Sequence, residues 1–116
     1  MKKFPPERIV CLTEETVETI YLLGEEKRIV GVTGYATRPK KVRNEKPRIS
    51  SFISANIDKI IDLEPDLILA FSDIQSEIVS NLIKKGQSVL CFNQRDIEGI
   101  FNMIQTISNL LDIKPV

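Results

Sequence analysis

Short apolar runs alternate along the chain with segments whose apolar residues follow a helical spacing. The apolar runs cover residues 9–12, 28–33, 67–71 and 88–92. Uninterrupted apolar runs of this length are typical of strands that are buried on both faces. Apolar stripes of helical period follow Thr13, Asn56, the pair Ser72 and Asp73, and finally Asp96. The pattern therefore predicts four strands and four helices, with N-caps at these polar residues.

The order of these elements predicts an α/β fold. Alternating strands and helices are typical of a parallel sheet covered by helices on both faces. We expect a three-layer α/β/α domain with a mainly parallel four-stranded sheet in the order 2-1-3-4. Residues 34–55 contain glycine, prolines and many charges without either period, which predicts one long loop. A length of 116 residues fits a single domain over residues 1–116.

Composition and charge exclude several classes of function. Sixteen basic side chains balance sixteen acidic ones, so charge gives no reason to expect a nucleic-acid or membrane-surface partner. Residues 38–48 concentrate six basic side chains, for which a solvated loop is favoured over an anion contact. No apolar run approaches the roughly 18 residues of a membrane-spanning helix. The N-terminal residues lack the apolar stretch of a signal peptide, so none is expected here.

The absence of histidine removes the commonest general base and the usual catalytic triads. It also excludes zinc sites that contain histidine. The chain has two cysteines, Cys11 and Cys91, in the first and last predicted strands. Two strand spacings separate them by about 9.6 Å, whereas a disulfide requires Cα atoms within about 7 Å. We therefore expect two buried free thiols, no metal site and no enzymatic activity.

Candidate binding residues follow the carboxyl ends of the predicted strands, where ligands of open α/β sheets bind. They are Thr13 and Glu14 after the first strand, and Ser72 and Asp73 after the third. No glycine-rich phosphate motif is present, and acidic residues after the first strand would repel a phosphate. The long loop contributes two aromatic residues, Tyr35 and Phe52. Each is either a lid on the core or a stacking surface for a large flat ligand, and the residues alone leave both open.

Several segments resemble the helical-backbone (class III) substrate-binding proteins of ABC importers, which take up vitamin B12, haem and iron-siderophores. These segments are RIVCLT at 8–13, VGVT at 30–33, PRI at 47–49 and NIDKIIDLEPDLI at 56–68. The last is similar to the family signature N-L-E-x-I-x-x-L-x-P-D-L-V. The resemblance covers essentially the whole chain and is greatest for the cobalamin-binding branch.

The resemblance implies a fold of two α/β lobes joined by one long helix, with the ligand held between them. This sequence accounts for the N-terminal, Rossmann-like lobe, and the second lobe would follow Val116. By the same resemblance, Phe52 flanks the corrin ring, the loop around Tyr35 borders the pocket, and Asp58 docks on an arginine of the permease. The sequence departs from the family at Glu14, where proline is frequent, at Phe52, where tryptophan is frequent, and at Asp58, where glutamate is usual.

These observations lead to one main expectation and two alternatives. The main expectation is the N-terminal lobe of an importer's substrate-binding protein for cobalamin or a related metal chelate, with an ABC permease as partner and no cofactor of its own. The expected ligand-binding residues are Thr13, Glu14, Tyr35, Phe52, Ser72 and Asp73, and Asp58 is the expected docking residue. The resemblance implies an extracytoplasmic location, whereas the missing signal peptide leaves the cytoplasm open.

The first alternative is a free-standing regulatory or protein-interaction domain. It would form a homodimer through the face that otherwise meets the second lobe. The second alternative is a carboxylate-based hydrolase that uses Glu14 or Asp73.

Overall fold

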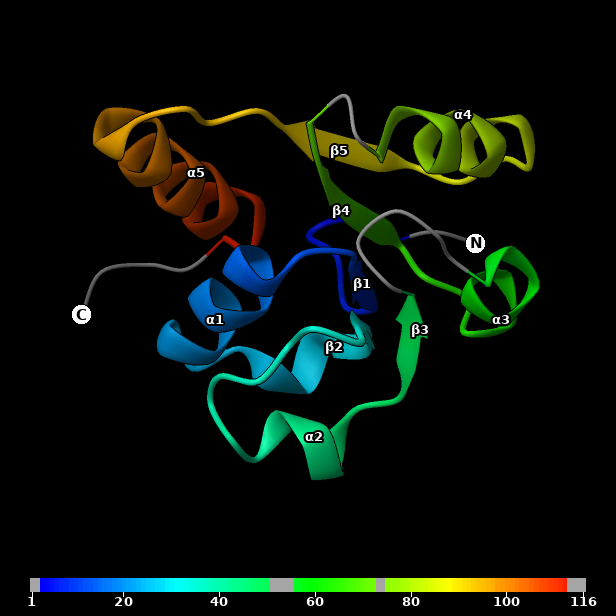
Figure 1. The fold of residues 1–116 in the computed structure, drawn as a ribbon, viewed down its shortest axis with the longest axis horizontal. Helices are drawn as coiled ribbons and strands as arrows, with labels where there is room; N and C mark the ends of the chain where they lie inside the picture. Colours follow the sequence, from blue (N-terminus) through cyan, green and yellow to red (C-terminus); the bar gives the residue numbers. More distant parts are fainter. Residues whose placement is uncertain (1–2, 51–55, 73–74, 113–116) are drawn as a thin grey trace.

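Five parallel strands form one sheet in the computed structural model, which describes residues 3–50, 56–72 and 75–112. The strands are β1 (Ile9–Cys11), β2 (Ile29–Thr33), β3 (Arg48–Ser50), β4 (Leu67–Phe71) and β5 (Val89–Phe92). The helices are α1 (Glu14–Leu22), α2 (Val42–Glu45), α3 (Ile57–Asp62), α4 (Ser76–Lys84) and α5 (Ile97–Leu110), with a 3₁₀ turn at Glu26–Arg28. The sheet order is β3-β2-β1-β4-β5 (Figure 1).

The predicted α/β class and parallel sheet are confirmed, but the sheet has five strands rather than four. The four predicted strands keep their expected order, and β3 is added beside β2. Both β3 and the short helix α2 lie inside the segment predicted as one long loop. Strand β3 has only three residues, of which Ile49 alone is apolar, so it has no strand-like pattern. Its pairing identifies it: the N–H of Val32 donates to the carbonyl oxygen of Pro47 at 3.0 Å.

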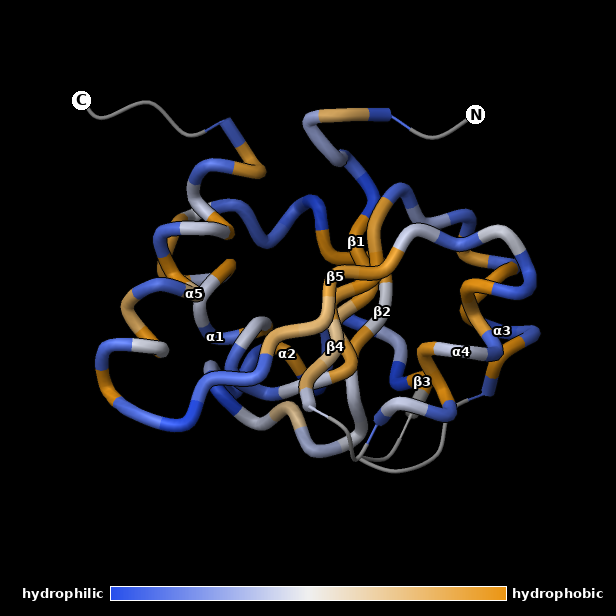
Figure 2. Tube along the Cα trace, turned by 90° about the horizontal axis from the view of Figure 1, so that it is seen from above, coloured by the Kyte–Doolittle hydropathy of each residue, from blue (hydrophilic) through white to orange (hydrophobic). Residues whose placement is uncertain are grey.

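Two apolar cores lie on opposite faces of the sheet. Helices α1 and α5 cover one face, and α3 and α4 cover the other (Figure 2). The central strand β1 shows the alternation most clearly, because Ile9 and Cys11 belong to the first core and Val10 belongs to the second. Successive side chains of a strand point to opposite faces. Both faces of β1 are completely buried, which explains why its sequence is an unbroken apolar run.

Two of the predicted helix caps are confirmed. The Asn56 side chain accepts a hydrogen bond from the N–H of Lys59 at 3.0 Å, and Asp96 accepts one from Gly99 at 2.7 Å. Thr13 precedes α1 as expected, but its side chain makes no capping bond. Helix α4 begins later than predicted, since its N-cap is Gln75 rather than Ser72 or Asp73.

The predicted apolar stripe of α5 is only partly buried. Met103 and Ile107 belong to the core, whereas Ile97 is 71% exposed and Phe101 is 65% exposed. Helical spacing indicates which residues share a face, but it does not indicate how far the neighbouring elements cover that face. The stripe therefore packs against the core in the later turns of α5 and is exposed at Ile97 and Phe101.

The two cysteines are free, as expected, but only one of them is buried. Cys11 lies on the central strand and is completely buried, which raises the pKa of its thiol to about 12. Cys91 lies on the edge strand β5 and is exposed, so the prediction of a second buried thiol is wrong. Partial burial still raises the pKa of the Cys91 thiol.

Thiol labelling should distinguish the two cysteines. At pH 8 and low micromolar protein, a maleimide or disulfide reagent is expected to modify one thiol per folded chain, at Cys91. Cys11 should react only after unfolding in denaturant, because the reactive thiolate is neither accessible nor stable in the core. Mass spectrometry of the labelled peptides checks the assignment. Rapid labelling of Cys11 in the folded chain would contradict the burial described here.

The described residues contain neither a membrane-spanning helix nor a cluster of metal ligands. None of the helices over these residues is long and apolar enough to cross a membrane. Among the same residues, no three histidine, cysteine, aspartate or glutamate side chains gather in a way that would hold a metal ion.

Candidate ligand-binding site

Four of the predicted binding residues lie at one edge of the molecule. Thr13 and Glu14 follow β1, Tyr35 follows β2, and Ser72 follows β4. Because the strands are parallel, their carboxyl ends meet at the same edge, which is the lower edge of the sheet in Figure 2. Phe52 and Asp73 lie outside the described residues, so the structure does not place them.

In the turn after β1, the Glu14 carboxylate is exposed, whereas Thr13 and Thr16 are buried. The hydroxyl groups of Thr13 and Thr16 are 3.0 Å apart, and the Thr16 hydroxyl donates to the Thr13 carbonyl oxygen at 3.1 Å. Both threonines are buried. Glu14 is exposed in the first turn of α1, where the helix dipole favours negative charge. Thr13 therefore shapes this turn, and Glu14 is the group that a ligand can reach.

The turn after β2 exposes an aromatic ring. The N–H of Ala36 donates to the Thr33 carbonyl oxygen at 3.1 Å, and the Thr33 hydroxyl accepts the N–H of Tyr35 at 3.4 Å. These bonds fix the backbone of the turn while leaving the Tyr35 side chain 55% exposed. An exposed ring at the end of a buried strand offers a stacking surface.

A buried glutamine that the sequence reading missed joins the ends of β1 and β4. Gln75 is completely buried at the start of α4. Its side-chain oxygen accepts the N–H of Phe71 at 2.9 Å, and its side-chain nitrogen donates to the Leu12 carbonyl oxygen at 3.0 Å. No local signal in the sequence indicates this role, because Gln75 precedes α4 and its partner Leu12 is 63 residues away.

Ser72 ends β4 in a left-handed backbone conformation, with φ of +60°. Its N–H donates to the Phe92 carbonyl oxygen at 2.7 Å, which ties the end of β4 to the end of β5. A non-glycine residue in this region carries strain, and such strain is frequent at binding sites. Ser72 is buried, and it contributes to one end of a groove of about 550 Å³ that continues between α4 and β5.

Asp58, the expected docking residue, is exposed in the first turn of the outer helix α3. It belongs to a helix rather than to a strand end, so it is separate from the residues that surround the carboxyl edge.

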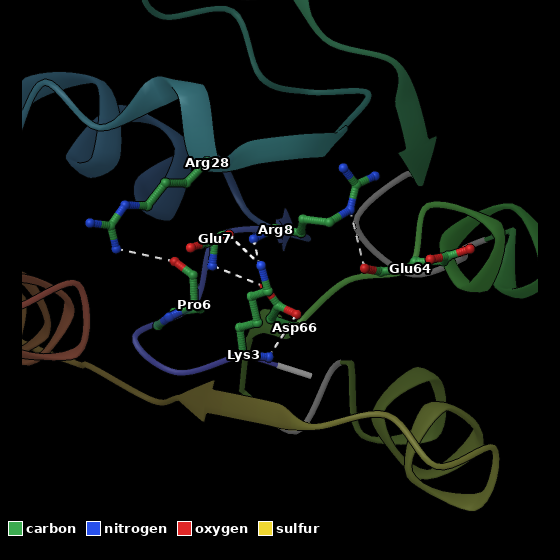
Figure 3. Close-up of polar contacts among 7 residues, drawn as sticks. All are labelled: Lys3, Pro6, Glu7, Arg8, Arg28, Glu64 and Asp66. Carbon is green, nitrogen blue, oxygen red and sulfur yellow. Dashed lines mark hydrogen bonds and ion pairs between the residues drawn. The ribbon is translucent and has the colours of Figure 1, made fainter. Parts of the chain in front are cut away.

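The aspartate of the L-E-P-D-L-I segment lies at the opposite edge of the sheet, before β4. Asp66 is almost completely buried and accepts three backbone N–H bonds (Figure 3). One carboxylate oxygen accepts the N–H of Lys3 at 3.0 Å, and the other accepts those of Glu7 and Arg8 at 2.9 and 3.0 Å. This carboxylate therefore holds the segment that leads into β1.

Two arginines bind carbonyl oxygens beside this carboxylate. Arg8 donates to the carbonyl oxygen of Glu64 at 3.2 Å, and Arg28 donates to that of Pro6 at 3.1 Å (Figure 3). Arg8 also donates to the carbonyl oxygen of Leu63 at 2.6 Å. These bonds connect the N-terminal segment with the turn before β4 and with the start of β2. The cluster is structural, because its charged groups bind the backbone of this chain.

Two lysines of the basic segment 38–48, Lys41 and Lys46, contact other groups of this chain. The Lys46 ammonium donates to the carbonyl oxygens of Glu26 and Ile29 at 2.7 and 2.8 Å, and burial lowers its pKa. Lys41 lies over the ring of Tyr21, 5.4 Å from its centroid. The Tyr21 hydroxyl donates to Glu45 at 2.8 Å, and burial together with this carboxylate raises the tyrosine pKa. These contacts account for Lys41 and Lys46, and they leave the other basic side chains of the segment for the expectation of a solvated loop.

Comparison with known proteins identifies the family. The periplasmic binding protein family matches residues 9–114. The vitamin B12-binding protein of Vibrio cholerae is 37% identical over 109 residues, which are 93% of this chain and 39% of that protein. A Bacillus subtilis protein described as an uncharacterized ABC transporter substrate-binding lipoprotein, YvrC, is 32% identical over 90% of this chain and 34% of its own length.

Solved structures agree with this assignment. The crystal structure of the periplasmic vitamin B12 binding protein BtuF of Vibrio cholerae matches with a TM-score of 0.83 and 28% identity, over 93% of this chain and 42% of that one. A periplasmic haem-binding protein from Pseudomonas aeruginosa matches with a TM-score of 0.84 at 19% identity, over 93% and 39% of the two chains, a likeness of fold alone.

The chain spans between a third and two fifths of the length of these curated relatives. The match therefore concerns part of proteins from a substrate-binding, non-enzymatic family, in agreement with the expectation that this chain is not an enzyme. The parallel sheet, the two helical layers and the match over residues 9–114 lead to the same conclusion: the chain belongs to the periplasmic binding protein family.

Proposed function

We propose that this chain is the N-terminal lobe of the substrate-binding component of an ABC importer, and that it holds one side of a large metal chelate. The observation that carries the proposal is the match of nearly the whole chain, at 37% identity, to a vitamin B12-binding protein. A corrinoid is therefore the first candidate, with haem and iron-siderophores as related ones. The chelate is the transported ligand, and the proposal includes no resident cofactor and no catalysis.

The carboxyl edge suits this ligand class by its chemistry. The exposed ring of Tyr35 offers an apolar face for a flat macrocycle, and Glu14, after the neighbouring strand β1, offers a hydrogen-bond acceptor at the same edge. The buried contacts of Thr13, Ser72 and Gln75 hold the surrounding turns in position. We retain Phe52 and Asp73 as proposed ligand contacts on the grounds given by the sequence.

The proposed partner is the importer's permease, with Asp58 as the docking carboxylate. Its exposure on an outer helix supports this role. An extracytoplasmic location follows from the same proposal, and the names of the matched relatives, one periplasmic and one a lipoprotein, support it.

One lobe should bind a chelate weakly, because it supplies about half of the contact area while much of the entropic cost of association remains. We expect saturable binding of cyanocobalamin in equilibrium dialysis, or of ferric haem in Soret titrations, with dissociation constants above about 10 µM. Replacing Tyr35 by alanine should weaken binding of the same chelate about fivefold or more, through the loss of the stacking face.

The matched control is Leu22→Ala, which removes an exposed apolar side chain at the far end of α1. It should leave the affinity unchanged. No saturable binding of cyanocobalamin, haem or a ferric siderophore at millimolar concentrations would contradict the proposed function. Equal losses in the Tyr35 and Leu22 variants would contradict the proposed site.

A further inference from the structure

The two edges of the sheet differ in how they are protected. Strand β3 at one edge begins with Arg48, directly after a lysine and a proline. Charged residues and prolines are the usual means by which edge strands avoid pairing with other chains. Strand β5 at the other edge reads Val89-Leu90-Cys91-Phe92, with none of these features. Within the described part of the chain, no strand pairs with its outer side.

An apolar groove accompanies the unprotected edge. It lies between α4 and β5 and has a volume of about 550 Å³, and its lining includes Val79, Ser80, Ile83 and Cys91. Ile83 is 56% exposed, and Cys91 is an exposed residue of the edge strand. In Figure 1, β5 is the outermost strand on its side of the molecule, with α4 beside it. A strand added to β5 would therefore bring alternate side chains over this groove.

The charged residues of α4 indicate which partner can dock beside the groove. Glu77 and Lys84 lie seven residues apart, at the first and last turns of α4, and therefore on one side of the helix. Lys84 is among the residues that line the groove. If a second copy placed its α4 antiparallel to this one, Lys84 of each copy would lie opposite Glu77 of the other. A parallel arrangement would instead place like charges together.

We propose that β5 and the groove face of α4 form a docking surface for a second copy of this chain, which pairs antiparallel along β5. We call the residues Glu77, Val79, Ile83, Lys84 and Cys91 the β5 surface. A two-fold axis perpendicular to the sheet continues the sheet from β5 to its copy and brings the two α4 helices together on one face. The neutral net charge of the chain opposes no such association.

This dimer uses a different surface from the homodimer considered from the sequence, which would bury the carboxyl edge. Antiparallel pairing directs the two carboxyl edges to opposite ends of the assembly, so the turns that carry Glu14 and Tyr35 stay open and only Ser72 lies at the end of the groove. The proposal is therefore independent of chelate binding, and the two can fail separately.

Sedimentation equilibrium of the 116-residue chain over about 5–200 µM tests the proposal by mass action. We expect a reversible monomer–dimer equilibrium without any added ligand. Ile83→Lys and Cys91→Lys should each raise the dissociation constant about tenfold or more, because each places a charge in the apolar centre. Leu22→Lys is the matched control at another exposed apolar position, and it should change nothing.

A charge exchange tests the orientation. Glu77→Lys and Lys84→Glu should each weaken the dimer several-fold, and the double variant should recover most of the original affinity. Maleimide labelling of Cys91 gives a readout without any substitution, because its rate should fall as the protein concentration rises. A monomer at every concentration, a dimer that survives Ile83→Lys, or a double variant weaker than both single ones would overturn the proposal.

Discussion

Replacing Asp66 by alanine should lower the free energy of unfolding by about 3 kcal/mol or more. The carboxylate accepts three backbone N–H groups from Lys3, Glu7 and Arg8, and it is almost completely buried. Alanine would leave these donors without their charged acceptor and would release the segment that leads into β1. Urea unfolding followed by circular dichroism measures the loss.

Two further variants make the Asp66 experiment specific. Asp66→Asn keeps the volume and one carbonyl oxygen, so it should lose less stability than alanine. Asp62→Ala removes the same charge from an exposed site at the end of α3, and it should change stability by less than about 0.5 kcal/mol. Equal effects of Asp66→Ala and Asp62→Ala would show that the three hydrogen bonds contribute nothing measurable.

Gln75→Leu is expected to cost about 2–4 kcal/mol, although leucine is close to glutamine in volume. The substitution leaves the N–H of Phe71 and the carbonyl oxygen of Leu12 without the partner that now joins them. Both groups lie where β1 and β4 end, and Gln75 itself is fully buried, so water does not easily replace the amide. Denaturant unfolding gives the global effect.

Hydrogen exchange gives the local effect of Gln75→Leu. The Phe71 amide should lose protection selectively, relative to amides in the middle of β4. Gln105→Leu, at an exposed site on α5, provides the matched control and should leave both stability and Phe71 protection almost unchanged. Unchanged Phe71 exchange in the Gln75 variant would contradict the role assigned to this side chain.

The four predicted strands and their order could be predicted because each is mainly apolar, as is typical of strands in a sheet covered on both faces. Asn56 and Asp96 could be predicted as caps because capping is a local property of adjacent residues. Strand β3 could not, since its three residues are strand-like only through their pairing with β2. Cys91 was expected to be buried because an apolar run does not show whether a strand is central or at an edge.

The candidate site was predicted from the topology of the sheet rather than from a sequence motif. The rule that ligands bind at the carboxyl ends of parallel strands selected Glu14 and Tyr35, and the structure brings their turns to one edge. The same rule could not show that the side chains of Thr13 and Ser72 are buried, since that depends on contacts across the sheet. Gln75 was missed because its partners, Phe71 and Leu12, belong to two strands that are distant in sequence.

The central position of β1 determines which strand edge stays unpaired while the protein is being synthesised. Its neighbours in the sheet are β2 and β4, and Ile9 pairs with Leu67. Strand β1 is synthesised first, and more than half of the chain must be made before β4 can pair with it. Until β4 emerges, one side of β1 is an apolar edge with open hydrogen-bonding groups. Such edges are prone to aggregation before their partners arrive. We therefore expect the nascent chain to be most prone to aggregation during synthesis of the segment between β2 and β4.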